Sequence, residues 1–283
     1  MNNWRHYSRN FLNLYLYSNL HIGLCVAAYT IYSFILLKVE VCWDYVLFVS
    51  FATSFLYATH RLIGIDLVGK YKFTGRFGII FNFRKLLLIL AFISGILTWV
   101  YFFRLSGNVQ LSMVAPGIIS LLYVLPFFNK KRLRDFPLIK IFLIAIVYTY
   151  NCQFIPGLAS NSFLPSLLLF CLSRMLFVFA ITVPFDIRDY QVDKETSVPT
   201  LVSKLGLTVS KGLAIGLVIL SMTIVSTYIL LYVMDPILII IEGIVHLFAL
   251  LLISFSSQER PDIYFSLYLD GCMGLFLIIY TIL

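Results

Sequence analysis

The sequence contains few charged residues. Asp, Glu, Lys and Arg make up 12% of its 283 residues, whereas soluble domains carry about 25%. Hydrophobic residues make up 61%, and the mean hydropathy is +0.96. A soluble core of this length could not bury so many apolar side chains, so the composition excludes a soluble globular domain and predicts a membrane protein.

The chain also lacks paired cysteines and a recognisable removable leader. None of its five cysteines forms a Cys-x-x-Cys pair, and most of them fall in apolar runs. This placement favours buried, reduced thiols over metal ligands or disulfides. The N-terminal residues show no apolar core followed by a small-residue cleavage site, so we expect no cleaved signal peptide.

What the sequence does have is a series of apolar runs of about 20 residues, the length that spans a bilayer. They predict an all-α polytopic membrane protein, with a single transmembrane helical domain over residues 1–283. We expect about nine transmembrane helices, at about residues 18–37, 43–65, 86–103, 109–128, 137–157, 163–184, 212–233, 236–254 and 263–283.

The net charge of +8 reports on topology rather than on nucleic acid. Eighteen Lys and Arg residues lie in the N-terminal tail and in the connections after even-numbered helices, and only Lys38 and Arg104 lie in the other connections. This asymmetry follows the positive-inside rule. It predicts a multi-pass protein of the cell inner or plasma membrane, with a cytoplasmic N-terminus and with membrane lipids, not nucleic acid, as its surroundings.

Two predicted connections are long, at about residues 66–85 and 185–211. Both follow an even-numbered helix, which places both on the predicted cytoplasmic side. Long ordered loops on a compact scaffold are often functional. We therefore expect these two segments to carry the active site.

The second of these segments contains four of the 13 acidic residues within positions 184–195. Asp186, Asp189 and Asp193 are spaced i, i+3 and i+7, so a helix would place the three carboxylates on one face. Mg²⁺ prefers oxygen ligands and commonly bridges carboxylates to phosphates. The alternative is a solvated acidic turn that is neutralised by its own Arg and Lys residues. Pro184, just before the cluster, can end or kink the sixth helix.

Cationic residues beside the aspartates favour an anionic ligand. Arg188, Lys194 and Lys204 follow or interleave with the three carboxylates. Their side chains could contact phosphate oxygens directly.

The spacing Asp-x-x-Asp-x-x-x-Asp after an even-numbered helix resembles the second aspartate-rich motif of the UbiA family of intramembrane prenyltransferases. The stretches "YVLPFFNKKRLRDFP" and "TSVPTLVSKLG" are also similar to that family. The resemblance implies a helical bundle around a central cavity. It also implies that Asp186, Asp189 and Asp193 are catalytic and bind Mg²⁺ together with an isoprenoid diphosphate, and that Arg188 and Lys194 bind the diphosphate.

The family's first motif should close the second helix, and there the sequence differs. The resemblance makes Asp66 the last aspartate of that motif and a further metal ligand. The preceding motif positions then fall on Leu62 and Ala58, which cannot bind metal. His60 and Arg61 lie beside them, and we expect both to contact the diphosphate, Arg61 as a fixed cation. Snorkelling of His60 and Arg61 to the interface is the alternative.

Further along the same connection, Asn82 and Arg84 resemble an Asn-x-Arg element of the family, which implies a phosphate-binding role for Arg84. Deeper in the predicted bundle, Arg174 needs a partner inside the membrane. Glu242 and Asp270 are both possible partners.

Together these features predict Mg²⁺-dependent transfer of a prenyl group from an isoprenoid diphosphate to an aromatic or other lipophilic acceptor within the membrane, as in quinone or lipid biosynthesis. The alternative is a non-catalytic relative that binds a lipid diphosphate, or a transporter. The aspartates lie at the rim of the predicted bundle, whereas transport sites tend to lie near the midplane.

Overall fold

The computed structural model describes residues 12, 14–65, 73, 75–125, 132–136, 139–160, 163–195 and 199–283. Within these residues, eight helices are long and apolar enough to cross a membrane, and α2 is a shorter apolar helix. In chain order the principal helices are α2 (Leu20–Leu36), α3 (Trp43–Gly64), α5 (Arg84–Phe102), α6 (Gly107–Val124), α7 (Ile139–Thr149), α9 (Leu164–Glu195), α11 (Leu207–Tyr228), α12 (Pro236–Ser254) and α13 (Asp270–Ile282). The predicted all-α class is confirmed. Of the predicted transmembrane helices, eight correspond to helices of spanning length among the described residues, and the first, at about 18–37, is the shorter α2.

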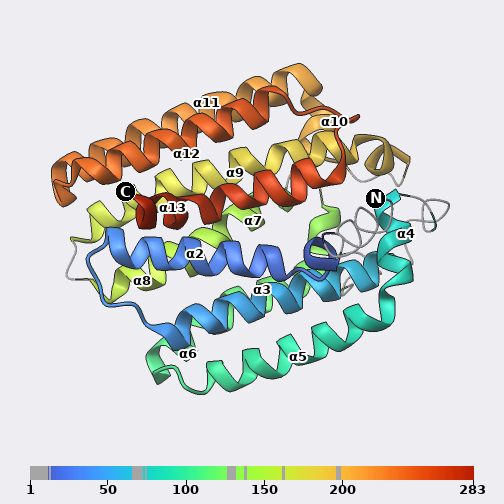
Figure 1. Cartoon of the computed structure of the whole chain (residues 1–283), viewed down its shortest axis with the longest axis horizontal. Coiled ribbons are helices and arrows are strands. Elements are labelled where there is room, and N and C mark those ends of the chain that lie inside the picture. The colour runs from blue at the N-terminus through green and yellow to red at the C-terminus, as the bar shows by residue number, and fades with distance from the viewer. Residues whose placement is uncertain are drawn as a thin grey trace, which may run out of the picture.

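Shorter elements extend or connect these helices. Three of them are π-helices. η3 (Tyr150–Phe154) continues α7, η4 (Ile229–Val233) continues α11, and η5 (Tyr264–Leu269) precedes α13. α8 (Ile155–Leu158) follows η3, and the 3₁₀ turn η2 (Leu133–Asp135) precedes α7. Two short helices, α4 (Gly75–Asn82) and α10 (Leu201–Leu205), lie at the same end of the bundle (Figure 1).

Helices far apart in the sequence lie side by side. α3 packs against α5 and α2, α9 packs against α11 and α7, and α13 packs along α2. Figure 1 shows these helices running along the long axis of the molecule, with the C-terminus at the end away from α4 and α10. We call the end that carries α4 and α10 the α4 end.

Large apolar side chains cover the outside of the bundle. Phe92, Trp99, Leu111 and Leu247 are between 59% and 74% exposed, and they project from helices long enough to cross a bilayer. Such exposure would be unfavourable in water and is expected where lipid is the solvent. The chain is therefore an integral multi-pass membrane protein.

A close approach between α2 and α3 depends on a glycine. A Cβ atom at Gly23 would lie 2.2 Å from Ser54 Oγ and 3.0 Å from the Ser50 carbonyl oxygen, so a larger residue would require the Ser54 side chain to move and would press against the α3 backbone. Ser50 Oγ donates a hydrogen bond of 2.9 Å to the Gly23 carbonyl oxygen. Small residues with hydroxyl-to-backbone contacts are a common way to bring membrane helices together. This contact fixes α2 against the helix that carries His60 and Arg61.

The aspartate segment differs from the predicted loop. α9 continues through the buried Pro184 and ends only at Glu195, and most of the rest of the predicted connection 185–211 forms α10 and the start of α11. The sequence suggested an end at Pro184 because the residues after it are polar. The extension is held by ion pairs to other helices, which are described below.

α10 has its own start and stop signals. Thr200 and Ser203 form a reciprocal capping box, which satisfies backbone N–H groups at the helix start. Gly206, with φ of 80°, separates α10 from α11, a conformation that favours glycine. In the first predicted loop, α4 and the start of α5 occupy residues 75–85, whereas Asp66 and its neighbours in 66–72 lie outside the described residues.

A fully buried ion pair joins α9 to α12. The Arg174 and Glu242 side chains are both 0% exposed. Arg174 donates two hydrogen bonds to the Glu242 carboxylate, at 2.9 and 2.5 Å. Tyr32 of α2 donates a further one at 2.9 Å, and the guanidinium carbon lies 4.8 Å from the Phe276 ring centroid. The partner of Arg174 is thus Glu242 and not Asp270.

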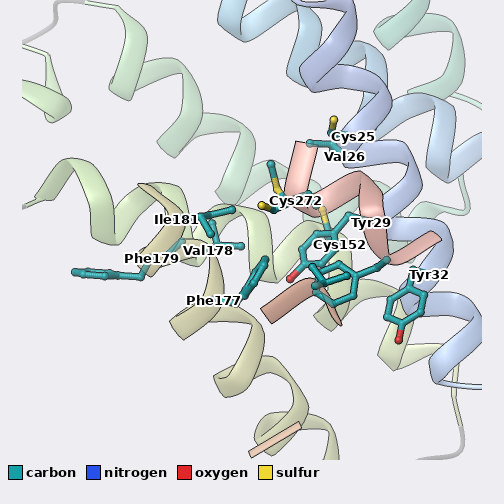
Figure 2. Packing of buried hydrophobic residues seen from close by; sticks show 14 of the residues in the cluster. Cys25, Val26, Tyr29, Tyr32, Cys152, Phe177, Val178, Phe179, Ile181 and Cys272 are labelled. Atoms are coloured by element: carbon teal, nitrogen blue, oxygen red, sulfur yellow. The ribbon is translucent and has the colours of Figure 1, made fainter. Parts of the chain in front are cut away.

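Cysteines and aromatic rings fill the surrounding core. Figure 2 shows Cys25, Cys152 and Cys272 among the side chains of the main hydrophobic cluster, near Tyr29 and Phe177. All five cysteines are free thiols, and Cys42 is exposed whereas the other four are buried. The predicted buried, reduced thiols are confirmed for those four.

Candidate active site at the α4 end

The three predicted aspartates lie on the part of α9 that projects to the α4 end. Because they are spaced by three and four residues on a continuous helix, they share one face. Asp186 is 1% exposed and Asp193 is 9% exposed, so neither is the freely solvated acidic turn of the alternative interpretation. Buried carboxylates need compensating charge, and the structure supplies it from other helices.

Lys140 of α7 compensates Asp186. Its Nζ donates to Asp186 Oδ1 at 2.6 Å, and its side chain is 12% exposed. The contact ties the first turn of α7 to the extension of α9. Charge-assisted hydrogen bonds of this length are among the stronger polar contacts, so this pair helps to keep α9 helical beyond Pro184.

Two arginines compensate Asp189. Arg76 Nη2 of α4 lies 2.8 Å from Asp189 Oδ1, and Arg188 binds the same carboxylate through Nε at 2.7 Å and Nη2 at 3.2 Å. All three side chains retain 14–17% exposure. Asp189 therefore positions a cation from its own helix and one from the short helix α4.

Asp262, just before η5, completes this cluster. Its Oδ1 lies 3.5 Å from Arg188 and 3.6 Å from Arg76, and its Oδ2 accepts a 3.2 Å hydrogen bond from Tyr17. Burial and the neighbouring Asp262 charge raise the pKa of the Tyr17 hydroxyl, which keeps it protonated as a donor. The cluster of Arg76, Arg188, Asp189 and Asp262 thus joins α4, α9, the segment before α2 and the segment before η5.

Sequence reasoning missed four of these residues. Arg76, Lys140 and Arg134 were counted only as positive charges of cytoplasmic connections, and Asp262 was not singled out. A usable signal was present for Asp262, because it is a scarce acidic residue in a connection after an even-numbered helix, like Asp186 and Asp189. No pattern in the sequence indicates which cation meets which carboxylate.

His60 and Arg61, at the end of α3, face different neighbours. Arg134 of η2 contacts the His60 ring through Nη1, which is 3.2 Å from Nδ1 and within contact of Nε2. Arg61 donates to the Leu16 carbonyl oxygen at 3.1 Å, and its guanidinium carbon lies 5.3 Å from the Tyr17 ring centroid. Neither side chain is fully buried, and both lie at the α4 end.

The remaining predicted site residues lie at the ends of helices or outside the described residues. Lys194 is exposed near the end of α9 and Arg84 begins α5. The charge of Asp193 interacts with those of Lys140 and Arg134. Asp66, the predicted ligand from the first motif, lies outside the described residues. Within the bundle, Asn151 donates to the Val147 carbonyl oxygen and Gln153 donates to Ser33 Oγ.

The described residues do not fit a preformed magnesium centre. Among them, no three His, Cys, Asp or Glu side chains converge as metal ligands. The carboxylates of Asp186 and Asp189 are occupied by cations, and Mg²⁺ would have to displace Lys140 from the first and Arg76 and Arg188 from the second. The last turns of α3 carry His60 and Arg61, whereas Mg²⁺ prefers oxygen ligands. Magnesium use by this chain stays a prediction.

No family model and no curated protein matches the sequence, but solved structures match the fold. A UbiA homolog from Archaeoglobus fulgidus bound to GPP and Mg²⁺ superposes with a TM-score of 0.68 at 12% identity, covering 95% of this chain and 98% of that one. The apo UbiA homolog from Aeropyrum pernix K1 gives a TM-score of 0.65 at 13% identity, covering 92% and 98%.

A digeranylgeranylglyceryl phosphate synthase structure is also similar, with a TM-score of 0.59 at 16% identity and coverage of 97% of this chain and 98% of that one. At these identities the likeness concerns the fold alone. It extends over nearly the whole length of each partner, which agrees with the resemblance noted in the aspartate motif. The chain therefore has the UbiA-type fold of intramembrane prenyltransferases.

Proposed function

We propose that this chain transfers a prenyl group from an isoprenoid diphosphate to a lipophilic acceptor within the membrane. The observation that carries the proposal is the convergence, in a UbiA-type fold, of Asp186 and Asp189 of α9 with Lys140, Arg76 and Arg188 at the α4 end. Similar folds bind GPP with Mg²⁺ or DMAPP with Mg²⁺, which supports a diphosphate donor.

The cations are suited to a diphosphate leaving group. In the transfer, the bond between the allylic carbon and the diphosphate oxygen breaks, and the electron pair leaves with the diphosphate. Lys140, Arg76 and Arg188 are fixed donors that stabilise this growing negative charge. Their present carboxylate partners hold them in place, so they need little reorganisation when an anion arrives.

Aromatic side chains at the site are suited to the allylic cation, the fragment that remains when the diphosphate leaves. The Arg188 guanidinium carbon lies 5.1 Å from the Phe185 ring centroid and 5.3 Å from that of Phe265, and Tyr148 donates to the Tyr57 hydroxyl at 3.0 Å. Aromatic faces attract cations, and an apolar site excludes the water that would capture an allylic cation. The acceptor then forms the new bond to carbon and releases a proton.

The charge distribution supports the orientation. The ion clusters, α4 and α10 lie at one end of the bundle, whereas Arg104 and Lys38 lie at the other, where Arg104 pairs with Asp44 and Lys38 bonds to the Val233 carbonyl oxygen. We propose that the α4 end is cytoplasmic, in the inner or plasma membrane, which would give the site access to water-soluble diphosphate.

A non-catalytic lipid-diphosphate binder is the second candidate. The specific observation in its favour is the end of α3, where Ala58 and Leu62 cannot bind metal and the cationic Arg61 lies beside them. A transporter has less support, because the charged pair of Arg174 and Glu242 is fully buried and each charge already has its partner.

The test uses purified protein in detergent. Geranyl, farnesyl and geranylgeranyl diphosphate are titrated with and without Mg²⁺, and diphosphate release is measured with a quinone or phenolic acceptor. Asp189→Asn should weaken donor binding at least tenfold, because Arg76 and Arg188 both lose the carboxylate that positions them. The matched control is Asp44→Asn, which removes a carboxylate at the opposite end.

The outcomes separate the candidates. Binding of the donor with release of diphosphate supports the transferase. Binding of the donor without release of diphosphate, whichever acceptor is present, supports the non-catalytic binder. An Asp189→Asn variant with unchanged donor affinity would remove the α9 carboxylates from the site.

A further inference from the structure

Arginines at the α4 end differ in whether a carboxylate binds them. Arg76 and Arg188 each form salt bridges with Asp189. Arg61 and Arg134 form none with any carboxylate that the structure describes; Arg61 bonds to a backbone carbonyl and Arg134 to the His60 ring. Among the side chains that the structure describes, positive charge is therefore in excess beside the end of α3 and η2, and balanced on the side formed by α9.

The two unbalanced arginines are held in place by neutral groups. Arg61 lies against the Tyr17 ring and donates to the Leu16 carbonyl oxygen. The Arg134 guanidinium carbon lies 5.6 Å from the Tyr123 ring centroid, and the His60 and Tyr123 rings are 6.4 Å apart. A guanidinium has five N–H donors, and these contacts use only part of that set. Each arginine therefore keeps donors for an anion.

Both arginines lie next to the predicted reaction site. Arg61 follows His60 on α3, and His60 contacts Arg134 directly. The charge of Arg134 interacts with Lys140 and Asp193, and that of Arg61 with Arg188 and Asp270. Asp270 is not within salt-bridge distance of Arg61, so it reduces the positive potential there without occupying the donors.

We propose that Arg61 and Arg134 form a phosphate subsite in which each arginine binds oxygens of the diphosphate directly, without a bridging metal ion. His60 positions Arg134 by accepting its hydrogen bond. This inference rests on the proposed function for the identity of the ligand. It follows from the mismatch between a metal-binding pattern and the cationic end of α3: guanidinium forks bind phosphate oxygens through paired hydrogen bonds and carry a permanent charge.

The subsite predicts diphosphate binding in the absence of divalent metal. The test is equilibrium dialysis of radiolabelled geranyl diphosphate and, separately, of inorganic pyrophosphate, each in excess EDTA and in Mg²⁺. Wild-type protein should bind geranyl diphosphate in EDTA with an affinity within about tenfold of that in Mg²⁺. Arg134→Gln should weaken binding in EDTA by about tenfold or more, since a charge-assisted hydrogen bond is lost.

Matched variants separate binding from folding. Arg134→Lys retains the charge without the fork and should give an intermediate affinity. Arg61→Gln should act in the same direction as Arg134→Gln. Arg104→Gln removes an arginine at the opposite end, where it pairs with Asp44, and should leave both ligands' affinities unchanged. Thermal unfolding of each variant identifies any loss of folded protein.

Each outcome bears on one of the two proposals. Geranyl diphosphate binding that disappears in EDTA, or an Arg134→Gln variant of unchanged affinity, overturns the metal-free subsite while leaving prenyl transfer intact. Binding of pyrophosphate but not of geranyl diphosphate, with loss in Arg134→Gln, supports the subsite and overturns the prenyl donor. Failure of wild-type protein to bind either ligand in either buffer overturns both.

Discussion

Two ionic networks on α9 differ in depth and in what they can do. Arg174 and Asp186 are twelve residues apart, or about 18 Å along a continuous helix. The deep pair of Arg174 and Glu242 is 0% exposed, whereas Lys140, Arg76, Arg188 and Asp262 near the α4 end keep 12–26% exposure. The same kinds of charged side chain therefore form one network that is fully buried and a second network that is partly exposed to solvent.

The difference in exposure determines which network can exchange partners. Removing one member of a buried pair leaves an uncompensated charge in a medium of low dielectric. A partly exposed pair can separate at lower cost, because water and an incoming anion replace the lost partner. The deep pair is thus a structural lock between α9 and α12, and the shallow cluster is the part of α9 that can accept a ligand.

The largest effect should come from breaking the deep pair. Glu242→Gln leaves the Arg174 charge buried with only a neutral amide, and we expect a loss of about 3–5 kcal/mol in the free energy of unfolding. Tyr32 and His246, which also contact Glu242, would lose a charged partner. Reversible unfolding in mixed micelles measures the change.

A double variant controls for this interpretation. Arg174→Met combined with Glu242→Leu removes both charges and should recover much of the lost stability, because buried ion pairs are often replaceable by apolar residues of similar volume. A Glu242→Gln variant within about 1 kcal/mol of wild type would show that the deep pair does not have the structural role assigned to it.

An intermediate effect is expected at Asp262. Asp262→Asn removes a 3.5 Å contact to Arg188 and a 3.6 Å contact to Arg76, and keeps a polar acceptor for Tyr17. Because both arginines retain Asp189, we expect a stability loss of about 1 kcal/mol or less and a smaller decrease in donor affinity than in Asp189→Asn. Thermal unfolding and donor binding measure the two quantities on the same preparation.

The ordering of the two variants is the informative result. If Asp262→Asn destabilises the protein as strongly as Glu242→Gln, the shallow cluster is as structural as the deep pair. If it weakens donor binding more than Asp189→Asn, Asp262 holds the arginines and Asp189 does not.

Hydropathy predicted the helices well and the end of α9 poorly. Long apolar runs such as 236–254 match the observed α12 because a bilayer-spanning helix is specified by its own composition. The extension of α9 past Pro184 depends on contacts with Lys140 and Arg76, which come from other helices. Local propensity contains no information about such partners, so the polar residues after Pro184 were predicted as a loop.

The sequence predicted the acidic residues of the candidate site but not the basic residues that bind them. Three scarce aspartates at helical spacing indicated Asp186 and Asp189 directly. Their partners Lys140 and Arg76 were hidden among the many Lys and Arg residues that the positive-inside rule already explains. The choice of Glu242 over Asp270 as the partner of Arg174 likewise required the packing of α9 against α12.

The smallest effect should come from an ion pair that is exposed and remote from α9. Arg104 Nη1 lies 3.6 Å from Asp44 Oδ1, and the two side chains are 58% and 43% exposed. Arg104→Gln should change the unfolding free energy by less than about 1 kcal/mol and leave donor affinity unchanged, measured as for Asp262→Asn. Added salt should change the stability of this variant little, because the variant no longer has the exposed pair that salt would screen. A loss comparable to that of Glu242→Gln would contradict the link between burial and energetic importance. The distinction between a structural network and a ligand-binding network rests on the exposure of the ion pairs, which rises from Arg174–Glu242 to the shallow cluster and to Arg104–Asp44. If an exposed pair stabilised the protein as strongly as the buried one, exposure could not be used to tell the two networks apart.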